Sequence, residues 1–191
     1  EKGYKVSEGY ASPEAISIDR GSSIENNEFF KEGKLIVQDE SAMLVSPLLD
    51  LEENMTVMDL CAAPGGKSTH IAELLNNKGK VLSFDIHKNK LSLIRENAKR
   101  LGISIIDARQ KDATQLNEDL VNTADRILLD VPCSGLGIIR KKPEIKYQKT
   151  IKDLKDIRDI QIDIMENAWS YLKSGGVMVY STCTLNKEEN E

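Results

Sequence analysis

From residue 55 onward, short apolar runs alternate with segments whose apolar residues recur three or four positions apart. A short apolar run between turn residues is typical of a buried strand, and the wider spacing is typical of a helix with one buried face. The pattern predicts strands over residues 56–60, 81–86, 103–106, 126–131 and 177–181. Because strands that alternate with helices pair in parallel, we expect a doubly wound, mostly parallel α/β sheet with right-handed crossovers.

Helices are predicted between these strands, over residues 67–75 and 88–101, and a longer helix precedes the last strand. Gly102 directly follows the second helix, where a left-handed residue is favoured. The longer helix is expected to end at Ser174-Gly175-Gly176, and its acidic residues alternate with Lys and Arg, which indicates a solvated face. Its apolar stripe is expected to comprise Leu154, Ile157, Ile160, Ile164, Ala168 and Leu172.

In residues 1–50 the sequence pattern indicates secondary structure less clearly. Turns are expected at Ser12-Pro13, Gly21-Ser22-Ser23 and Glu32-Gly33, a short strand over residues 34–37 and a helix over residues 41–49. We expect this segment to form an extension that packs on a domain made of residues 51–191. The chain of 191 residues fits that arrangement, since a domain commonly has about 150 residues.

Charge and cysteine content narrow the possible functions. The net charge is −5, so any attraction to a nucleic acid must come from a local patch. The three cysteines form no C-x-x-C pair, which argues against a disulfide framework or a zinc site, and no metal is expected. The sequence has no apolar run long enough for a membrane span and no signal-peptide stretch at its start, so we expect a cytoplasmic protein.

Polar and reactive residues follow the predicted strands, where doubly wound sheets bind their ligands. They are Asp59-Leu60-Cys61-Ala62-Ala63-Pro64-Gly65-Gly66-Lys67, then Asp85, Asp112, Asp130-Val131-Pro132-Cys133-Ser134-Gly135 and Thr182-Cys183-Thr184.

The glycine loop by itself allows several interpretations. Gly66-Lys67-Ser68 matches the end of a P-loop, but Cys61 stands where that motif needs glycine, and the dinucleotide pattern is also incomplete. A plain strand-to-helix turn would suffice for the loop alone. However, Asp85 lies 19 positions after Gly66, close to the spacing at which a carboxylate reaches ribose hydroxyls. Together these residues favour an adenosine compound without a polyphosphate.

Taken together, the motifs resemble the S-adenosylmethionine-dependent RNA (cytosine-5)-methyltransferase family, most closely its bacterial 16S ribosomal RNA branch of Sun or Fmu proteins. The similarity extends from Val37 to Asn190. It comprises the Cys-Ala-Ala-Pro-Gly-Gly-Lys loop, Asp-Val-Pro-Cys-Ser-Gly, Ile139-Arg140 with Pro143-Glu144-Ile145, and Ser181-Thr182-Cys183, in the family's order.

The resemblance implies a Rossmann-like methyltransferase sheet and a catalytic domain over residues 51–191. Family members usually have two further strands and, in this branch, a preceding helical RNA-binding domain, so we expect a truncated form. The implied S-adenosylmethionine site assigns the ribose hydroxyls to Asp85 and the adenine amino group to Asp112, and Lys67 is also expected to face the substrate. The implied cofactor-binding residues are Cys61, Ala62, Ala63, Pro64, Gly65, Gly66, Lys67, Asp85, Asp112 and Asp130.

Methylation at carbon 5 of cytosine requires a nucleophile, because that carbon is too electron-poor to attack a methylsulfonium until a group adds at carbon 6. A thiolate suits this addition. The residues alone leave Cys133 and Cys183 equivalent, and the resemblance implies Cys183 as nucleophile and Cys133 as the thiol that helps product release. Asp130 is expected to bind the cytosine edge, and a raised pKa from burial would let it donate to ring nitrogen 3. Cys61 is expected to be a small buried residue.

The stretch from Arg140 to Lys149 carries five basic residues and one acidic residue. The Pro-Cys loop, residues 130–135, is followed by Arg140, Lys141 and Lys142. Because these charges would stand beside the site, we expect them to hold RNA phosphates, and the alternative is a solvated loop without a binding role. The expected function is methylation of carbon 5 of a cytosine in 16S ribosomal RNA. Alternatives are a non-catalytic RNA-binding or ribosome-assembly factor and a transfer RNA methyltransferase. His70 and His87 form no ligand or triad pattern, and roles on a helix surface or in a turn are expected.

Overall fold

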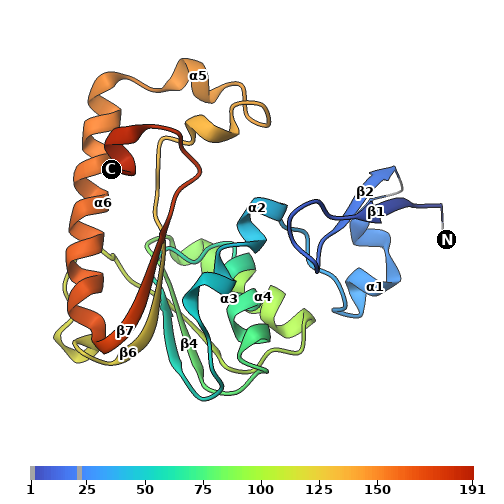
Figure 1. Cartoon of the computed structure of the whole chain (residues 1–191), viewed down its shortest axis with the longest axis horizontal. Helices are drawn as coiled ribbons and strands as arrows, with labels where there is room; N and C mark the ends of the chain where they lie inside the picture. The colour runs from blue at the N-terminus through green and yellow to red at the C-terminus, as the bar shows by residue number, and fades with distance from the viewer. Residues whose placement is uncertain (1–2, 21–22) are drawn as a thin grey trace.

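A five-stranded parallel sheet forms the centre of the molecule, as seen in a computed structural model that describes residues 3–20 and 23–191 (Figure 1). The strand order is β5-β4-β3-β6-β7, and every neighbouring pair is parallel. The chain runs outward from β3 in one direction and returns to the other side at β6, which confirms the predicted doubly wound α/β sheet. The strands are β3 (Thr56–Asp59), β4 (Lys80–Asp85), β5 (Ile106–Gln110), β6 (Ala124–Asp130) and β7 (Leu172–Ser181).

Helices cover both faces of the sheet. α3 (Gly66–Leu74) and α4 (Leu91–Arg100), the latter preceded by the 3-10 turn η3 (Lys88–Lys90), lie on one face, and α6 (Ile151–Tyr171) lies on the other. Successive strand residues point to opposite faces. In β3, Val57 therefore joins the buried cluster of α3, whereas Met58 joins that of α6.

The inward stripe of α6 differs from the prediction at two positions, Ile160, which is exposed, and Leu172, which lies beyond the helix in β7. Ile160 is 41% exposed, and Gln161, at 2%, takes the inward place between Ile157 and Ile164. The helix also ends at Tyr171, and Ser174-Gly175-Gly176 lies within β7. The alternating charges of α6 lie mostly on its exposed side, as predicted.

The prediction for the third strand of the sheet was displaced. β5 begins at Ile106, where the predicted segment 103–106 ends, and pairs with β4 from Val81–Ile106 to Asp85–Gln110. Its sequence, Ile-Asp-Ala-Arg-Gln, shows no apolar run because β5 is an edge strand with an exposed far half. The preceding apolar residues instead cover the core at the start of β4, where the Val81 N–H donates to the Ile105 carbonyl.

The first 50 residues differ most from the prediction. They contain an antiparallel pair, β1 (Lys5–Glu8) and β2 (Ile16–Arg20), which the sequence pattern did not indicate, followed by η1 (Ile24–Asn26) and α1 (Glu28–Lys31). No strand forms over residues 34–37. The predicted helix over residues 41–49 is divided into α2 (Glu40–Met43) and η2 (Ser46–Leu49), because Pro47 lacks the N–H that a continuous helix would need to donate to the Met43 carbonyl. Part of the predicted turn, at Gly21 and Ser22, lies outside the described residues.

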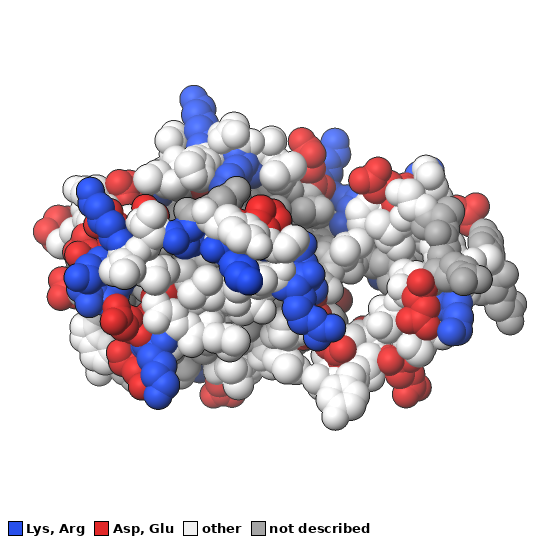
Figure 2. Space-filling view, turned by 90° about the horizontal axis from the view of Figure 1, so that it is seen from above, with Lys and Arg blue, Asp and Glu red and all other residues white. Residues whose placement is uncertain are grey.

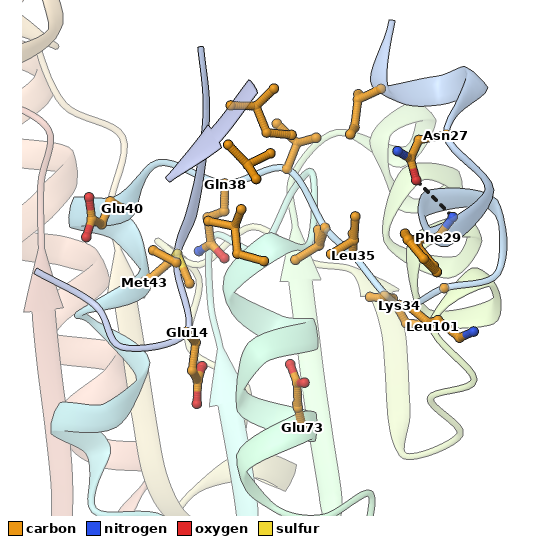
Figure 3. A pocket seen from close by; sticks show the side chains of 18 of the residues that line it. Glu14, Asn27, Phe29, Lys34, Leu35, Gln38, Glu40, Met43, Glu73 and Leu101 are labelled. Carbon is orange, nitrogen blue, oxygen red and sulfur yellow. Dashed lines mark hydrogen bonds between the residues drawn. The ribbon is translucent and has the colours of Figure 1, made fainter. Parts of the chain in front are cut away.

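Arg100, at the end of α4, links this segment to the α/β sheet. Its guanidinium donates to the Phe30 and Leu35 carbonyls, both at 2.8 Å, and lies 3.9 Å from the centroid of the Phe30 ring. The bond to Leu35 uses a backbone acceptor within residues 34–37 that a strand partner would need. A cavity of about 1750 Å³ lies beside this contact, with Leu35, Gln38 and Met43 on one side and Glu73 of α3 on the other (Figure 3). None of the predicted cofactor or catalytic residues lines it.

Candidate active site

The carboxyl edge of the sheet carries a row of polar residues. Asp59, Asp85 and Asp130 are the last residues of β3, β4 and β6, and Ser181 is the last residue of β7. Because all of these strands are parallel, their ends meet at one edge, and the register places Asp130 opposite Ser181. The following loops therefore converge, as the sequence predicted.

The glycine loop folds back onto the end of β4. The Ala62 N–H donates to the Phe84 carbonyl at 2.8 Å, and the Ala63 N–H donates to Asp85 Oδ2 at 3.2 Å. Gly65 has φ +103°, and an added Cβ would lie 3.1 Å from the Ile94 Cα, so both its conformation and its contact with α4 require glycine. The loop is thereby held with its backbone against Asp85.

Two carboxylates line the side of this loop that faces β4 and β5. Asp85 is 8% exposed, and its other oxygen accepts the His87 N–H at 2.8 Å. Asp112 lies two residues beyond β5, where its Oδ1 accepts from the Thr114 N–H and hydroxyl. The Lys111 N–H donates to the Asp85 carbonyl at 3.1 Å, which holds the Asp112 loop beside the end of β4.

Lys67 and Asp130 form an ion pair between α3 and β6. The Lys67 Nζ lies 2.6 Å from Asp130 Oδ2, and Asp130 Oδ1 accepts from the Ser181 hydroxyl at 2.8 Å. The two side chains are 17% and 34% exposed. The Lys67 ammonium thus lies at the ends of β6 and β7.

Cys133 and Cys183 lie side by side. Their sulfur atoms are 3.2 Å apart, and the Cys183 N–H donates to the Cys133 sulfur at 3.3 Å. The Cys183 carbonyl accepts the Gly137 N–H at 3.0 Å, and a Cβ on Gly137 would lie 2.8 Å from that oxygen. The segment that follows the Pro-Cys loop (residues 130–135, at the end of β6) therefore lies against the Thr-Cys loop (residues 182–184, after β7). The two thiols thus meet although they come from two different strands.

This contact separates the acidities of the two thiols, which titrate as a pair. Donation from the Cys183 thiol, aided by the backbone N–H groups of Cys183 and Gly135, lowers the pKa of Cys133 to about 6 despite burial. The same bond, together with burial, raises the pKa of Cys183. The pair thus holds one negative charge, mainly on Cys133, near neutral pH. Burial and three nearby carboxylates raise the pKa of Cys61 to about 12. Cys61 is partly buried and packs against the core cluster beneath α6, rather than being fully buried as predicted.

Asp59, which the sequence places at the start of the glycine loop and to which no role was assigned, is a buried group. It is 1% exposed, its Oδ2 accepts from Ser68 at 2.7 Å, and Ser68 in turn accepts from Ser83 at 2.8 Å. Its Oδ1 is buried without a hydrogen-bond partner. Burial, only partly offset by the Ser68 bond, raises the pKa of Asp59 to about 7.

A second buried carboxylate, Glu189, was also not predicted from the sequence as part of the site. It lies in η6 (Lys187–Glu189), is 4% exposed and contacts the Pro-Cys loop and α6. The available signal was Gln161, a polar residue at an inward helical position. Its partner could not be read from spacing alone, because the two residues are 28 positions apart.

The predicted RNA-binding residues are exposed. Arg140, Lys141 and Lys142 follow the 3-10 turn η5 (Leu136–Ile138) and precede α5 (Ile145–Gln148). On the face that carries α5, Lys and Arg side chains predominate over the middle of the surface (Figure 2). Lys141 is ion-paired with Asp39. The contact between Gly137 and Cys183 keeps this basic stretch next to the thiols.

The two histidines lie apart from this centre. His70, expected on a helix surface or in a turn, is instead buried at 6%, because residues of the N-terminal segment cover α3 there, with Glu14 Oε2 3.5 Å from its Nε2. His87 is exposed in the turn before η3, as predicted.

The family can be decided by comparison with known proteins. A family profile described as "16S rRNA methyltransferase RsmB/F" matches residues 46–191, which include every loop of this site. The chain belongs to this family. The resemblance inferred from its motifs is thereby confirmed.

The chain is similar to bacterial proteins named ribosomal RNA small subunit methyltransferase B. The chain is 47% identical over its whole length to the probable ribosomal RNA small subunit methyltransferase B of Bacillus subtilis, and 40% identical over 93% of its length to the corresponding protein of Proteus mirabilis. It spans 42% of each of these relatives.

Solved structures agree with this placement. NSun6 from Pyrococcus horikoshii, crystallised with SFG, superposes on 92% of the chain with a TM-score of 0.79 and 36% identity, and the match covers 46% of that protein. A methyltransferase homolog from Pyrococcus horikoshii superposes on 99% of the chain with a TM-score of 0.86 and 34% identity, covering 59% of that protein.

Within residues 3–20 and 23–191, every helix is too short or too polar to cross a lipid bilayer. The same residues hold no group of three or more His, Cys, Asp or Glu side chains suited to binding a metal ion.

Proposed function

We propose that this chain contains the catalytic centre of an S-adenosylmethionine-dependent RNA methyltransferase that acts on carbon 5 of a cytosine in 16S ribosomal RNA. The observation that carries the proposal is the contact of 3.2 Å between Cys133 and Cys183 beside the Lys67–Asp130 ion pair. In the names of its relatives, ribosomal RNA of the small subunit is the substrate. Residues 51–191 are proposed as the catalytic domain and residues 1–50 as an extension packed on it.

The residues along β4 and β5 fit the proposed cofactor. Asp85 and Asp112 are acceptors beside a backbone loop that glycine keeps open, and each carboxylate retains lone pairs for ribose hydroxyls or an adenine amino group. SFG, which NSun6 binds, is an analogue of S-adenosylmethionine. When bound, S-adenosylmethionine supplies a methyl group activated by its sulfonium. The residues of the loop, from Cys61 to Lys67, would hold its methionine part.

The thiol pair suits nucleophilic addition. The Cys133 thiolate accepts the proton of Cys183 across their hydrogen bond, and the Cys183 sulfur then forms a bond to carbon 6 of the cytosine. That addition makes carbon 5 electron-rich enough to take the methyl group. Transfer of the carbon 5 proton to water leaves the electron pair that re-forms the ring double bond as the sulfur–carbon bond breaks. The departing Cys183 thiolate takes back the proton that Cys133 had accepted, which is how Cys133 assists release and how the pair is restored.

The Lys67–Asp130 pair lies beside the thiols and is proposed to orient the base. Asp130 accepts from Ser181 as well as from Lys67, so its carboxylate is fixed at the end of β6. We propose that Asp130 binds the cytosine edge and that Lys67 faces ring atoms on which negative charge develops during thiolate attack. Arg140, Lys141 and Lys142 would hold phosphates of a strand whose target base is turned out.

The test combines the purified chain, S-adenosylmethionine with a labelled methyl group, and small-subunit ribosomal RNA, followed by mapping of the modified base. Label at carbon 5 of a cytosine is expected. Retention of the RNA without incorporation of label would instead identify a binding or assembly factor. Label in transfer RNA but not in ribosomal RNA would redirect the proposal to that substrate.

A further inference from the structure

Glu189 is a buried carboxylate with four hydrogen-bond donors from three parts of the chain. Its Oε1 accepts from the Ser134 hydroxyl at 2.5 Å and from Asn186 Nδ2 at 3.0 Å. Its Oε2 accepts from the Ser134 N–H at 2.9 Å and from Gln161 Nε2 at 3.1 Å. Burial raises the pKa of Glu189, but these bonds outweigh it and the net pKa is lowered, so the group is a carboxylate at neutral pH.

These donors flank Cys133 on both sides. Ser134 directly follows it, and Gln161 Nε2 also donates to the carbonyl of the preceding residue, Pro132, at 2.8 Å. The Ser134 hydroxyl lies 2.7 Å from the hydroxyl of Thr184, the residue after Cys183. One carboxylate therefore connects α6, the Pro-Cys loop and the Thr-Cys loop.

We propose that Glu189 is a positioning residue that holds the Pro-Cys and Thr-Cys loops where Cys133 and Cys183 touch. The importance of this contact for catalysis rests on the function proposed above, whereas the contact itself can be measured without any reaction. A buried carboxylate is stable only when its hydrogen-bond donors are in place, so it fixes the geometry of its neighbours more strictly than an apolar side chain would.

Removal of the Glu189 charge has two opposing effects on Cys133. The titratable groups that face Cys133 are Cys183, Glu189 and Tyr180. The charge of Glu189 raises the pKa of Cys133 slightly, whereas the bond from Cys183 lowers it and is the larger influence. If Glu189 acts only through its charge, its removal lowers the pKa of Cys133. If it holds the thiols together, its removal raises that pKa.

The experiment measures alkylation of the intact chain by iodoacetamide between pH 5 and 10, without cofactor or RNA. The three cysteines lie in different tryptic peptides, so mass spectrometry follows each separately. In Glu189→Gln the pH of half-maximal alkylation of Cys133 is expected to rise by more than about one unit, toward the ordinary value of a thiol. Glu188→Gln, an exposed neighbour in the same turn, is the matched control and should leave the profile unchanged.

A second variant tests the same hydrogen bonds in case Glu189→Gln does not fold. Ser134→Ala removes the hydroxyl donor but keeps the N–H bond, so it should shift the profile in the same direction by less. Circular dichroism verifies folding, and if Glu189→Gln does not fold, Ser134→Ala decides. An unchanged or lowered profile in the folded variant overturns the positioning role. Because alkylation needs no methyl transfer, failure of the chain to methylate RNA would overturn the proposed function alone.

Discussion

The ammonium group of Lys67 lies 2.6 Å from a carboxylate oxygen of Asp130, so the first turn of α3 is ion-paired with the last residue of β6. The two residues are 63 positions apart and belong to two different loops of the family motif pattern. Lys67 is the better shielded partner, with 17% of its side chain exposed against 34% for Asp130.

Replacement of Lys67 tests this pair. Lys67→Met should lower methyl transfer by about 100-fold or more, because general-acid or electrostatic assistance to thiolate attack is commonly of that size. The measurement is the rate of label incorporation at saturating RNA. Lys78→Met removes an exposed lysine paired with Glu53 and should leave the rate unchanged. Equal rates for both variants would exclude a role of Lys67 in the reaction.

The two thiols should differ in the consequence of their removal. Cys183→Ala should abolish incorporation of label, since no sulfur remains to add to carbon 6. Cys133→Ala should accumulate a covalent protein–RNA adduct, visible as a slower band on a denaturing gel, because release is impaired. Normal turnover by Cys183→Ala would show that the nucleophile is misassigned.

Asp59 predicts a pH dependence of stability. Its pKa is about 7 in the folded protein, above the ordinary value of about 3.9 in the unfolded chain, so the folded state binds more protons between these values. Its contribution to stability is therefore present at about pH 4 and is lost as the pH rises through 7. Asp59→Asn should flatten the decline of the melting temperature over this range. A decline of wild-type steepness in the variant would assign the effect to other groups.

The basic stretch predicts a change in salt dependence. Alanine at Arg140, Lys141 and Lys142 should weaken RNA binding and reduce the slope of log affinity against log salt by about 2, since each lost phosphate contact accounts for about 0.7 on a single strand. Alanine at Lys78, Lys80 and Lys99, three exposed lysines at the opposite edge of the sheet, removes the same charge and should change the slope less. Identical slopes for the two triple variants would contradict local phosphate binding.

The sequence by itself determined the sheet and the loops that carry the site. β3, β4 and β6 are buried on both faces, so their apolar runs are visible in the sequence, and parallel strands necessarily bring the glycine loop, Asp85, Asp130 and both cysteine loops to one edge. The position of β5 was predicted wrongly, because an edge strand needs no apolar run and so leaves no such pattern in the sequence. The N-terminal pair β1 and β2 was missed because its residues are mostly exposed.

Only the tertiary structure decided which of these residues touch. The contact between Cys133 and Cys183 joins positions 50 apart, and it depends on the pairing of β6 with β7 and on the close approach of Gly137. The inward-facing side chain of Gln161 and the burial of Glu189 depend on how α6 packs against the Pro-Cys and Thr-Cys loops. Hydrophobic periodicity predicts which face of a segment is buried. It does not predict which hydrogen-bond donor meets which distant acceptor, because that depends on how whole helices and strands pack against one another.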